Sequence, residues 1–361
     1  MKNAFLALVL CLAPQLSLAV DYQLETLAEG FNFPWSITFL PDGDYLVAMR
    51  SGEVRRVTAD GVAAKPLTGT PETYVAGQGG YFDIVLDPAF AGNSTVYLAY
   101  AGGTPRANGT TITRATLTDQ GFANATVIFS ATPTKDTPQH YGGKLLFLPD
   151  GTLMLTTGDG FEYRERAQDK FGQMGKVLRM NPDGSTPADN PFADGTGGNP
   201  LVYSYGHRNP QGLARNSITG AIYMHEHGPK GGDELNLVLP GANYGWPAVT
   251  YGENYTGAYV SPLKQAPGVE EPMHYWVPSI APSGMVVYDG DAFPAWRGDV
   301  FIGALVNREV RHLKMAGDKV VSESSLFGEL GERIRDVRVG PEGFLYLLTD
   351  GDQGKIVRVR P

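Results

Sequence analysis

A short phrase that repeats along the chain limits its possible folds more than any other feature. The phrase reads FLPDGDYLV at residues 39–47, FLPDGTLML at residues 147–155 and VGPEGFLYL at residues 339–347. Proline presets φ for a turn, the acidic side chain bonds to the turn backbone, and glycine adopts a positive φ. Since an apolar run follows each turn, the repeating unit is a turn that leads into a buried strand.

Weaker copies begin at residues 87, 217 and 294, which brings the number of units to six. Their spacing predicts an all-β fold, a six-bladed β-propeller of four-stranded antiparallel blades. We expect a strand at residues 22–27 to pair beside the C-terminal strands and close the ring, because an open sheet edge invites aggregation. The best candidate for a short helix is residues 164–178. A β-sandwich with coincidental turns is the alternative fold.

The first 19 residues have the pattern of a secretory signal peptide. A short charged start precedes an apolar run at residues 4–13, and small residues at 17 and 19 suit a cleavage site. We therefore expect a leader at residues 1–19 and a single propeller domain at residues 20–361. The only cysteine, Cys11, lies in this leader, so the mature chain has no thiol. Export without disulfides indicates a bacterial protein that is periplasmic or secreted.

Charge and missing motifs exclude several classes of protein. The formal net charge of −9 argues against nucleic acid and against anionic membranes as partners. No apolar run is long enough for stable membrane insertion. The sequence has no dinucleotide-binding or phosphate-binding glycine loop, and no nucleophile elbow.

A histidine and an aspartate are predicted to meet at one hairpin. His140 opens the strand that runs into the second repeat, and Asp159 follows the next strand. A histidine oriented by a carboxylate is a general base. The alternative is a structural histidine that bonds to a loop carbonyl.

Three arginines stand out in this acidic chain, namely Arg208, Arg333 and Arg335. In an Arg-x-Arg strand segment both side chains point to the same face. Together they suit a ligand with several carboxylates. The alternative is ion pairing within the protein, with Asp159, Asp233 or Asp336 as partners.

Gly228 and Pro229, followed by Asp233 and Glu234, form a candidate loop for a hard cation. Calcium binds backbone carbonyls and carboxylates. Turn formation alone also explains the glycines of this loop.

Eight loop segments occur in an order that resembles one known family. They are residues 77–80 (GQGG), the His140 loop, and residues 158–159 (GD), 206–212 (GHRNPQG), 233–236 (DELN), 243–247 (NYGWP), 281–284 (APSG) and 333–337 (RIRDV). The chain is similar to the soluble quinoprotein glucose dehydrogenases and PQQ-dependent aldose sugar dehydrogenases from about residue 33 to the C-terminus. The GHRNPQG string is specific to this resemblance, whereas the PDG turns are not. The family fold is a six-bladed propeller.

The resemblance implies roles for individual residues. His140 matches the catalytic base and Asp159 the carboxylate beside it. The positions implied to contact PQQ are Gln78, Arg208, Asn209, Arg333, Arg335 and Trp276. The carbonyls of Gly228 and Pro229 match those that bind the active-site calcium. Glu234 and the Tyr244 carbonyl match a second, structural calcium site.

The implied reaction is the PQQ- and Ca²⁺-dependent oxidation of aldose sugars at C1 to aldonolactones. Hydride would pass to C5 of PQQ while His140 takes the hydroxyl proton. The expected partners are a small-molecule sugar and an external electron acceptor. Asn307 stands where the glucose enzymes carry a lysine, and the chain lacks their long insertions. A calcium-dependent lactonase and a non-catalytic binding propeller remain as alternative functions.

Overall fold

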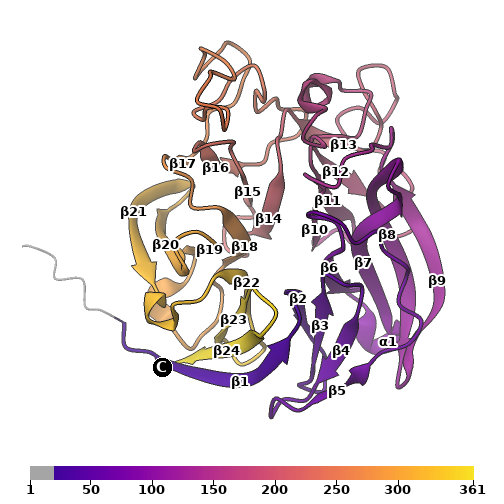
Figure 1. The fold of residues 1–361 in the computed structure, drawn as a ribbon, viewed down its shortest axis with the longest axis vertical. Helices are drawn as coiled ribbons and strands as arrows, with labels where there is room; N and C mark the ends of the chain where they lie inside the picture. The colour runs from indigo at the N-terminus through magenta and orange to yellow at the C-terminus, as the bar shows by residue number, and fades with distance from the viewer. Residues whose placement is uncertain (1–19) are drawn as a thin grey trace, which may run out of the picture.

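The computed structural model describes residues 20–361, and the expected leader at residues 1–19 lies outside this range. The described chain forms six four-stranded antiparallel sheets arranged as blades around an axis (Figure 1). The predicted all-β, six-bladed propeller is therefore confirmed. Among the described residues, no helix is long and apolar enough to cross a membrane.

Each of the first five blades is built from four strands that are consecutive in the chain. Blade 1 has β2 (Pro34–Phe39), β3 (Tyr45–Met49), β4 (Val54–Val57) and β5 (Ala63–Pro66). Blade 2 has β6 (Tyr81–Leu86), β7 (Thr95–Thr104), β8 (Ala107–Thr118) and β9 (Gly121–Ser130). Blade 3 has β10 (Gly142–Phe147), β11 (Leu153–Thr157), β12 (Lys176–Met180) and β13 (Val202–Tyr205). Blade 4 has β14 (Pro210–Arg215), β15 (Ile222–Glu226), β16 (Asp233–Leu237) and β17 (His274–Trp276). Blade 5 has β18 (Pro282–Val287), β19 (Val300–Ala304), β20 (Glu309–Ala316) and β21 (Lys319–Leu326).

Blade 6 joins the two ends of the chain. It combines β22 (Ile334–Val339), β23 (Leu345–Thr349) and β24 (Gly354–Arg360) with β1 (Gln23–Phe31). Strand β1 runs antiparallel to β24, with Gln23 opposite Arg360. This pairing confirms the predicted closure, although β1 extends further than residues 22–27. The N-terminal strand thus covers the edge that β24 would otherwise leave open.

The repeated turns that predicted the blades have one geometry. In each turn the first backbone N–H donates to a carbonyl four residues later, at 2.8 Å: Leu40 to Asp44, Leu148 to Thr152, and Gly340 to Phe344. The glycine inside the first turn, Gly43, has a φ of 93°, which other residues adopt only with strain. These turns join the first and second strands of blades 1, 3 and 6.

Within residues 20–361, helical structure is limited to short segments: α1 (Phe90–Asn93), η1 (Arg164–Gln168), η2 (Pro294–Trp296) and η3 (Gly328–Leu330). The helix expected at residues 164–178 is therefore wrong beyond its first turn. The buried ammonium of Lys176 donates to the carbonyls of Arg166 and Ala167, both at 2.9 Å, so these carbonyls do not continue a helix. Gly175 then takes a φ of 67° and leads the chain into β12.

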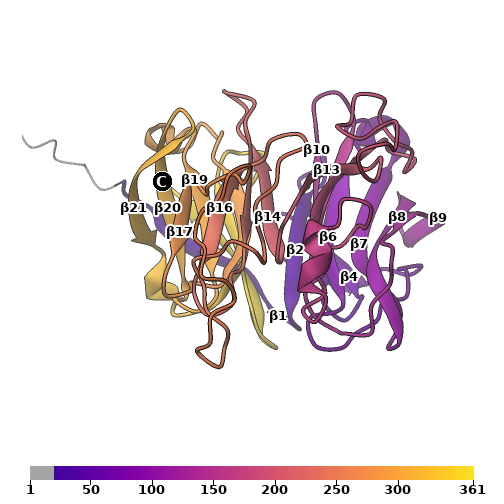
Figure 2. The same cartoon turned by 90° about the horizontal axis from the view of Figure 1, so that it is seen from above.

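The first strand of every blade lies next to the axis, and each carries an irregularity of the same kind. Figure 1 shows β2, β6, β10, β14, β18 and β22 gathered at the centre of the ring, and Figure 2 shows β2, β10 and β14 from the side. The register between the first and second strands shifts near the start of each of these inner strands. A β-bulge bends its strand and re-aims a side chain. Six bulges therefore surround one end of the axis.

Below the bulges, charged side chains from different blades meet in the protein interior. Asp83 of β6 and Asp336 of β22 are both fully buried. Arg338 donates to both carboxylates, at 2.8 Å to Asp83 and 2.9 Å to Asp336. Lys144 of β10 adds a bond of 3.4 Å to Asp336. This axial ion network links blades 2, 3 and 6.

We predict that Asp336→Asn lowers the free energy of unfolding by about 3 kcal/mol or more, because it leaves the buried Lys144 and the partly buried Arg338 with too little compensating charge. Urea denaturation followed by tryptophan fluorescence measures the change. The control is Asp291→Asn, since Asp291 forms an exposed pair with Arg297. Exposed pairs contribute up to about 1 kcal/mol. Equal losses in the two variants would contradict a structural role for the axial ion network.

Candidate active site

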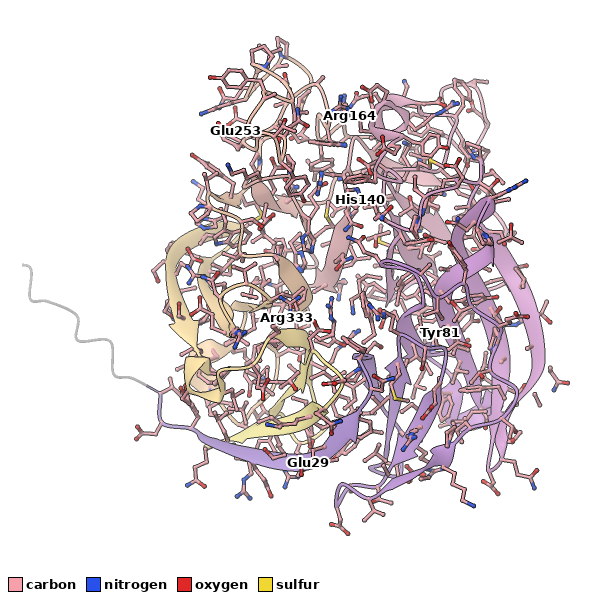
Figure 3. The ribbon with its side chains drawn as sticks, viewed as in Figure 1. Glu29, Tyr81, His140, Arg164, Glu253 and Arg333 are labelled. Carbon is pink, nitrogen blue, oxygen red and sulfur yellow. The ribbon has the colours of Figure 1, made fainter. Side chains whose placement is uncertain are left out.

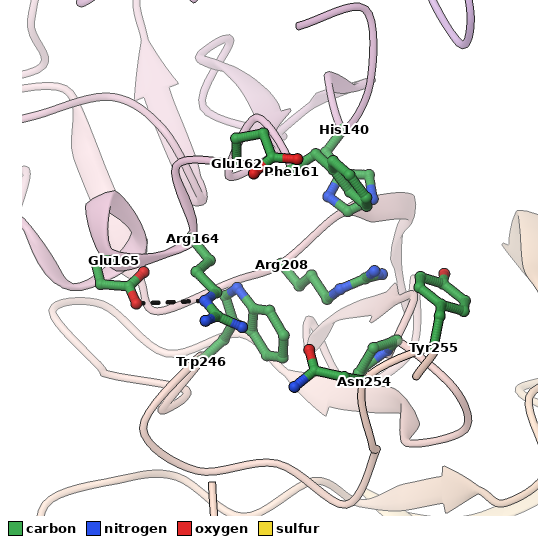
Figure 4. A pocket seen from close by; sticks show the side chains of 10 residues that line it. His140, Phe161, Glu162, Arg164, Glu165, Arg208, Trp246, Asn254 and Tyr255 are labelled. Atoms are coloured by element: carbon green, nitrogen blue, oxygen red, sulfur yellow. Dashed lines mark hydrogen bonds and ion pairs between the residues drawn. The ribbon is translucent and has the colours of Figure 1, made fainter. Parts of the chain in front are cut away.

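Loops at the bulged end of the ring enclose several cavities, and two neighbouring ones contain most of the predicted site residues. We call the larger one the axial cavity; its volume is about 490 Å³. The second, the His140 pocket, has a volume of about 360 Å³ and is drawn in Figure 4. Figure 3 shows His140 and Arg333, one from each cavity, near the centre of the ring. The axial cavity is lined by Phe33, Trp35, Arg50, Gly77, Gln78, Asn209, Gln211, His227, Ala281, Leu305, Arg333, Arg335 and Asp350. The His140 pocket is lined by His140, Phe161, Glu162, Arg164, Glu165, Arg208, Pro229, Trp246, Asn254 and Tyr255.

His140 and Asp159 form the hydrogen-bonded pair that their positions predicted. The Nδ1 atom of His140 lies 2.7 Å from Oδ1 of Asp159, and both side chains are buried. Because an ionised carboxylate only accepts, the proton of the imidazole sits on Nδ1 and the lone pair on Nε2. Within the described residues, Nε2 makes no hydrogen bond. The ring lines the pocket with a basic nitrogen available (Figure 4).

Two further donors hold the carboxylate of Asp159 in place. The backbone N–H of Phe161 donates to Oδ1 and the indole Nε1 of Trp246 donates to Oδ2, both at 2.7 Å. The Phe161 ring also packs edge-on against the imidazole, with centroids 5.1 Å apart. Asp159 therefore fixes the tautomer and the orientation of His140 from a rigid position.

Burial decides the charge of His140. Desolvation lowers the pKa of this imidazole below its ordinary value of 6.5, and the hydrogen bond and charge of Asp159 oppose that shift without reversing it. Nearby Arg208 and Lys135 lower the pKa further. His140 is consequently neutral at pH 7, which is the form that can accept a proton.

The backbone of His140 is also held by the neighbouring cavity. Its φ of 49° is unusual for a residue with a side chain, and such conformations cluster at functional sites. The side-chain oxygen of Gln78 accepts from the His140 N–H at 2.8 Å, and the Gln78 N–H donates to Pro138 at the same distance. Gln78 thus connects the axial cavity to the loop that carries His140.

Arg333 and Arg335 both line the axial cavity, as the Arg-x-Arg pattern predicted. Their shared partner is Asp350, at 3.0 Å from Arg333 and 3.2 Å from Arg335. None of the three aspartates considered from the sequence takes this role. The Arg335 guanidinium lies 4.0 Å from the centre of the Trp35 ring. Since one carboxylate faces two guanidinium groups, positive charge remains in excess in this cavity.

Arg208 and Asn209 follow one another where the two cavities approach. Arg208 Nη1 donates to the carbonyls of His227, at 3.0 Å, and Gly228, at 2.7 Å. The guanidinium carbon lies 5.4 Å from the centre of the Trp246 ring. Asn209 accepts from the Gly142 N–H at 3.2 Å. These bonds brace the cavity wall and also leave Arg208 facing the His140 pocket.

Asp233 shapes the loop that contains Gly228 and Pro229. Its Oδ1 accepts from the Gly228 N–H at 2.9 Å, and its Oδ2 accepts from the Ile280 N–H at 2.8 Å and the Ser279 hydroxyl at 2.6 Å. Burial raises the pKa of Asp233, and these donors oppose the rise. Both oxygens of the Asp233 carboxylate are therefore occupied by hydrogen bonds within the protein, and the loop offers mainly its carbonyl oxygens to a ligand.

A small cavity of about 10 Å³ lies behind this loop, and Glu226, Glu234 and Tyr244 line it. Such a volume holds about one water-sized group. Burial and the neighbouring Glu226 carboxylate raise the pKa of Glu234 well above its ordinary value. Within the structure's described range, Oδ1 of Asn236 is buried and accepts no hydrogen bond. The two glutamates supply carboxylate oxygens of the kind that a hard cation binds, and the amide nitrogen of Asn236 donates to both of them, at 3.4 Å and 3.5 Å.

A cluster of purely acidic and imidazole ligands is absent from residues 20–361. There, no group of three or more His, Cys, Asp or Glu side chains is arranged to hold a metal ion. A metal ion at either candidate site would therefore need backbone or amide oxygens as well.

Two residues considered from the sequence lie apart from the cavities. Trp276 sits on β17, the outer strand of blade 4, where it is buried and its indole donates to Glu323 at 2.8 Å. It lines neither cavity, because the outer strand is far from the axis; the indoles at the site are Trp35 and Trp246. The Asn307 amide donates to Glu309 on the exposed side of its loop.

Several residues that line the axial cavity are not among the cofactor-binding residues predicted from the sequence, although they share one positional signal. Arg50, His227, Leu305 and Asp350 each come directly after the second strand of their blade, and all four line the axial cavity. Aligning the six repeats at the end of this strand would have identified them. Trp246 lies in a segment that the sequence analysis quoted, but its bond to Asp159 spans 87 residues.

Comparison with known proteins gives one consistent result. The family model for glucose/sorbosone dehydrogenases matches residues 31–358. Aldose sugar dehydrogenase YliI of Escherichia coli is 39% identical over 367 residues, covering 100% of this chain and 99% of that protein. The crystal structure of the soluble aldose sugar dehydrogenase from Escherichia coli, in its apo form, superposes with a TM-score of 0.91 at 38% identity, covering 94% of this chain and 100% of that one. The PQQ-bound aldose sugar dehydrogenase of Streptomyces coelicolor superposes with a TM-score of 0.77 at 28% identity, covering 94% and 99%.

We predict that Asp159→Asn lowers the pKa of His140 further, because it removes the carboxylate whose hydrogen bond and charge raise that pKa. The His140 imidazole stays neutral at pH 7 in the wild-type protein and in the variant, and in the variant it titrates at a more acidic pH. NMR of histidine labelled with ¹⁵N measures the titration, with Asp291→Asn as the control. A His140 pKa above 6.5 in the wild-type protein would contradict the dominance of burial.

Proposed function

The chain belongs to the glucose/sorbosone dehydrogenase family, and from this premise we propose that it is a PQQ-dependent oxidoreductase that oxidises aldose sugars at C1 to aldonolactones. The single observation that carries the proposal is the arrangement of a neutral, carboxylate-oriented His140 beside an arginine-lined cavity. The expected partners are a small-molecule sugar and an external electron acceptor. Periplasmic or secreted localisation rests on the leader expected at residues 1–19.

The axial cavity fits PQQ in charge and in size. PQQ carries three carboxylates, and Arg333 and Arg335 face the cavity with one aspartate between them. Guanidinium groups bind carboxylates through paired hydrogen bonds. The volume of about 490 Å³ lies in the usual range for small-molecule sites. Gln78, Arg208 and Asn209 would complete the contacts to the cofactor.

The calcium proposal rests on oxygen donors in two places. The Gly228 and Pro229 carbonyls would hold one ion beside the cofactor, and the Gly228 carbonyl already faces a cation, the Arg208 guanidinium. Glu234 and the Tyr244 carbonyl would hold a second, structural ion. The Glu226 carboxylate, which lines the same small cavity as Glu234, supports that second site.

His140 performs the proton transfer in this proposal. The lone pair on Nε2 faces the pocket, so a sugar bound there can donate its C1 hydroxyl proton to this nitrogen. Asp159 stabilises the imidazolium that forms, and Trp246 keeps Asp159 in position. When bound, PQQ supplies the hydride acceptor at its C5 carbon and calcium polarises the C5 carbonyl.

The two alternative functions use less of the site. A calcium-dependent lactonase has no need for Arg333 and Arg335 in the axial cavity. A binding propeller has no need for a histidine whose tautomer is fixed by a buried carboxylate. The dehydrogenase is the function that uses both cavities together.

We predict that the apoprotein does not oxidise sugars with an artificial dye as acceptor, and that PQQ with calcium restores activity. The assay is dye reduction with a panel of aldoses, repeated with NAD in place of PQQ. Full activity after exhaustive removal of PQQ would refute the proposed function, and so would activity that depends on NAD.

We predict that His140→Ala loses about 10²–10⁴ in kcat while PQQ affinity changes little, because only the proton acceptor is removed. Asp159→Asn should lose less, since the base remains. In the wild-type protein kcat should fall in acid with an apparent pKa below 6.5, the direction in which burial shifts His140. Measuring kcat, PQQ affinity and melting temperature on one sample separates catalysis from folding; turnover within about threefold of wild type would rule His140 out as the base.

We predict that calcium raises the melting temperature of the apoprotein and that Glu234→Gln reduces this shift, because the variant loses a ligand of the second site and keeps the Gly228 and Pro229 carbonyls. A ligand at 100 times its dissociation constant stabilises the folded state by about 2.7 kcal/mol. Differential scanning calorimetry with calcium or with a chelator measures the shift. The matched control is Glu29→Gln, an exposed glutamate on β1 (Figure 3). If Glu234→Gln retains the full calcium shift, the ion does not bind there.

A further inference from the structure

Arg50 occupies a place in blade 1 that repeats around the ring. It follows directly after β3, the second strand of its blade, as His227 follows β15 and Asp350 follows β23. All three residues line the axial cavity. The fold therefore brings Arg50 to the same cavity as Arg333 and Arg335, from a different blade.

The guanidinium of Arg50 has unused hydrogen-bonding capacity. Its one hydrogen bond within residues 20–361 is to the Gly77 carbonyl, at a long 3.5 Å, and its carbon lies 4.5 Å from the centre of the Phe33 ring. No carboxylate within the described part of the chain pairs with it. Arginine carries several N–H donors in a fixed fork, so most of them remain available to a ligand. By contrast, Arg333 and Arg335 share Asp350.

Packing holds Arg50 in this position. A Cβ atom at Gly80 would lie 2.1 Å from the Arg50 carbonyl oxygen and 2.6 Å from its Cγ. Gly80 also has a φ of 145°, a conformation that side chains disfavour. The glycine-rich loop at residues 77–80 thus fits closely against Arg50 at both its backbone and its side chain. Phe33 supports the guanidinium from another side.

The arginines that line the axial cavity are Arg50, Arg333 and Arg335. Asn307 turns away toward Glu309, so blade 5 contributes no side-chain charge from that position. The guanidinium of Arg335 lies over the ring of Trp35, which belongs to the same blade as Arg50. Arg50 and the arginine pair therefore border one continuous space.

We infer that Arg50 is a further cofactor-binding residue, which pairs with a carboxylate of PQQ that Arg333 and Arg335 do not hold. The inference rests on the proposed function and deepens it. Arg50 acts on affinity and orientation, and it takes no part in proton transfer.

The test measures direct binding of PQQ to the apoprotein at fixed calcium, by calorimetry or quenching of tryptophan fluorescence. Arg50→Gln should weaken PQQ binding about tenfold or more, the size expected for loss of a charge-assisted contact. Arg335→Gln is the reference for a cavity arginine. The matched control is Arg56→Gln in the same blade, which pairs with Asp44 on the surface and should leave PQQ affinity unchanged.

A second probe, the trimethyl ester of PQQ, identifies the contact. The ester keeps the ring system but has no ionised carboxylates, so Arg50→Gln should weaken its binding far less than that of PQQ. Arg50→Lys, which keeps the charge, should recover part of the PQQ affinity. Unchanged melting temperatures of the apoproteins confirm folding.

The outcomes separate this inference from the proposed function. Wild-type affinity for PQQ in Arg50→Gln overturns the inference, and so does an equal loss for PQQ and its ester. Failure of the wild-type protein to bind PQQ overturns the proposed function itself.

Discussion

The axial ion network is the constraint on which the rest of the structure depends. Asp83 accepts from the Ser36 hydroxyl of blade 1 at 2.8 Å and from the Leu145 N–H of blade 3 at 3.1 Å, besides Arg338. Because these groups are buried, a blade shifted along its neighbour would leave charges unpaired, at several kcal/mol each. Gly284 of blade 5 belongs to the same arrangement, since a Cβ there would lie 2.0 Å from Asp336. The network thus fixes the relative height of the blades.

Fixed blade heights bring the residues of the site together. The bulge of each inner strand lies just above the network, and Trp35, Gln211 and Arg335 occupy bulge positions that line the axial cavity. His140 precedes β10 and Asp159 follows β11, so one hairpin presents both members of the pair. Trp246 reaches Asp159 from the long loop between β16 and β17 of blade 4. The His140 pocket accordingly depends on distant segments.

The sequence was most informative where the determinants are local. Turn chemistry predicted the blades, and strand periodicity predicted that Arg333 and Arg335 share a face. The closeness of His140 and Asp159 was predictable because the two residues flank the same β-hairpin. Trp276 and the helix at residues 164–178 were assigned less well, because their environment is tertiary: an outer strand in one case and the ammonium of Lys176 in the other. Arg50 and Asp350 follow the repeats at residues 39–47 and 339–347, and the closed ring brings these two positions to one cavity.

The bulge divides each inner strand into a part near the cavity end and a part that pairs regularly with the next strand. At three of the bulges a side chain, Trp35, Gln211 or Arg335, lines the axial cavity; beyond each bulge the strand resumes regular pairing with its neighbour. Substitutions at bulge positions that touch across blades, such as Trp35 and Arg335, should therefore be non-additive, because the Arg335 guanidinium lies over the Trp35 ring. The residues that line the cavity at the bulges can therefore change, and with them the ligand preference, while the regularly paired parts of the inner strands keep the scaffold intact.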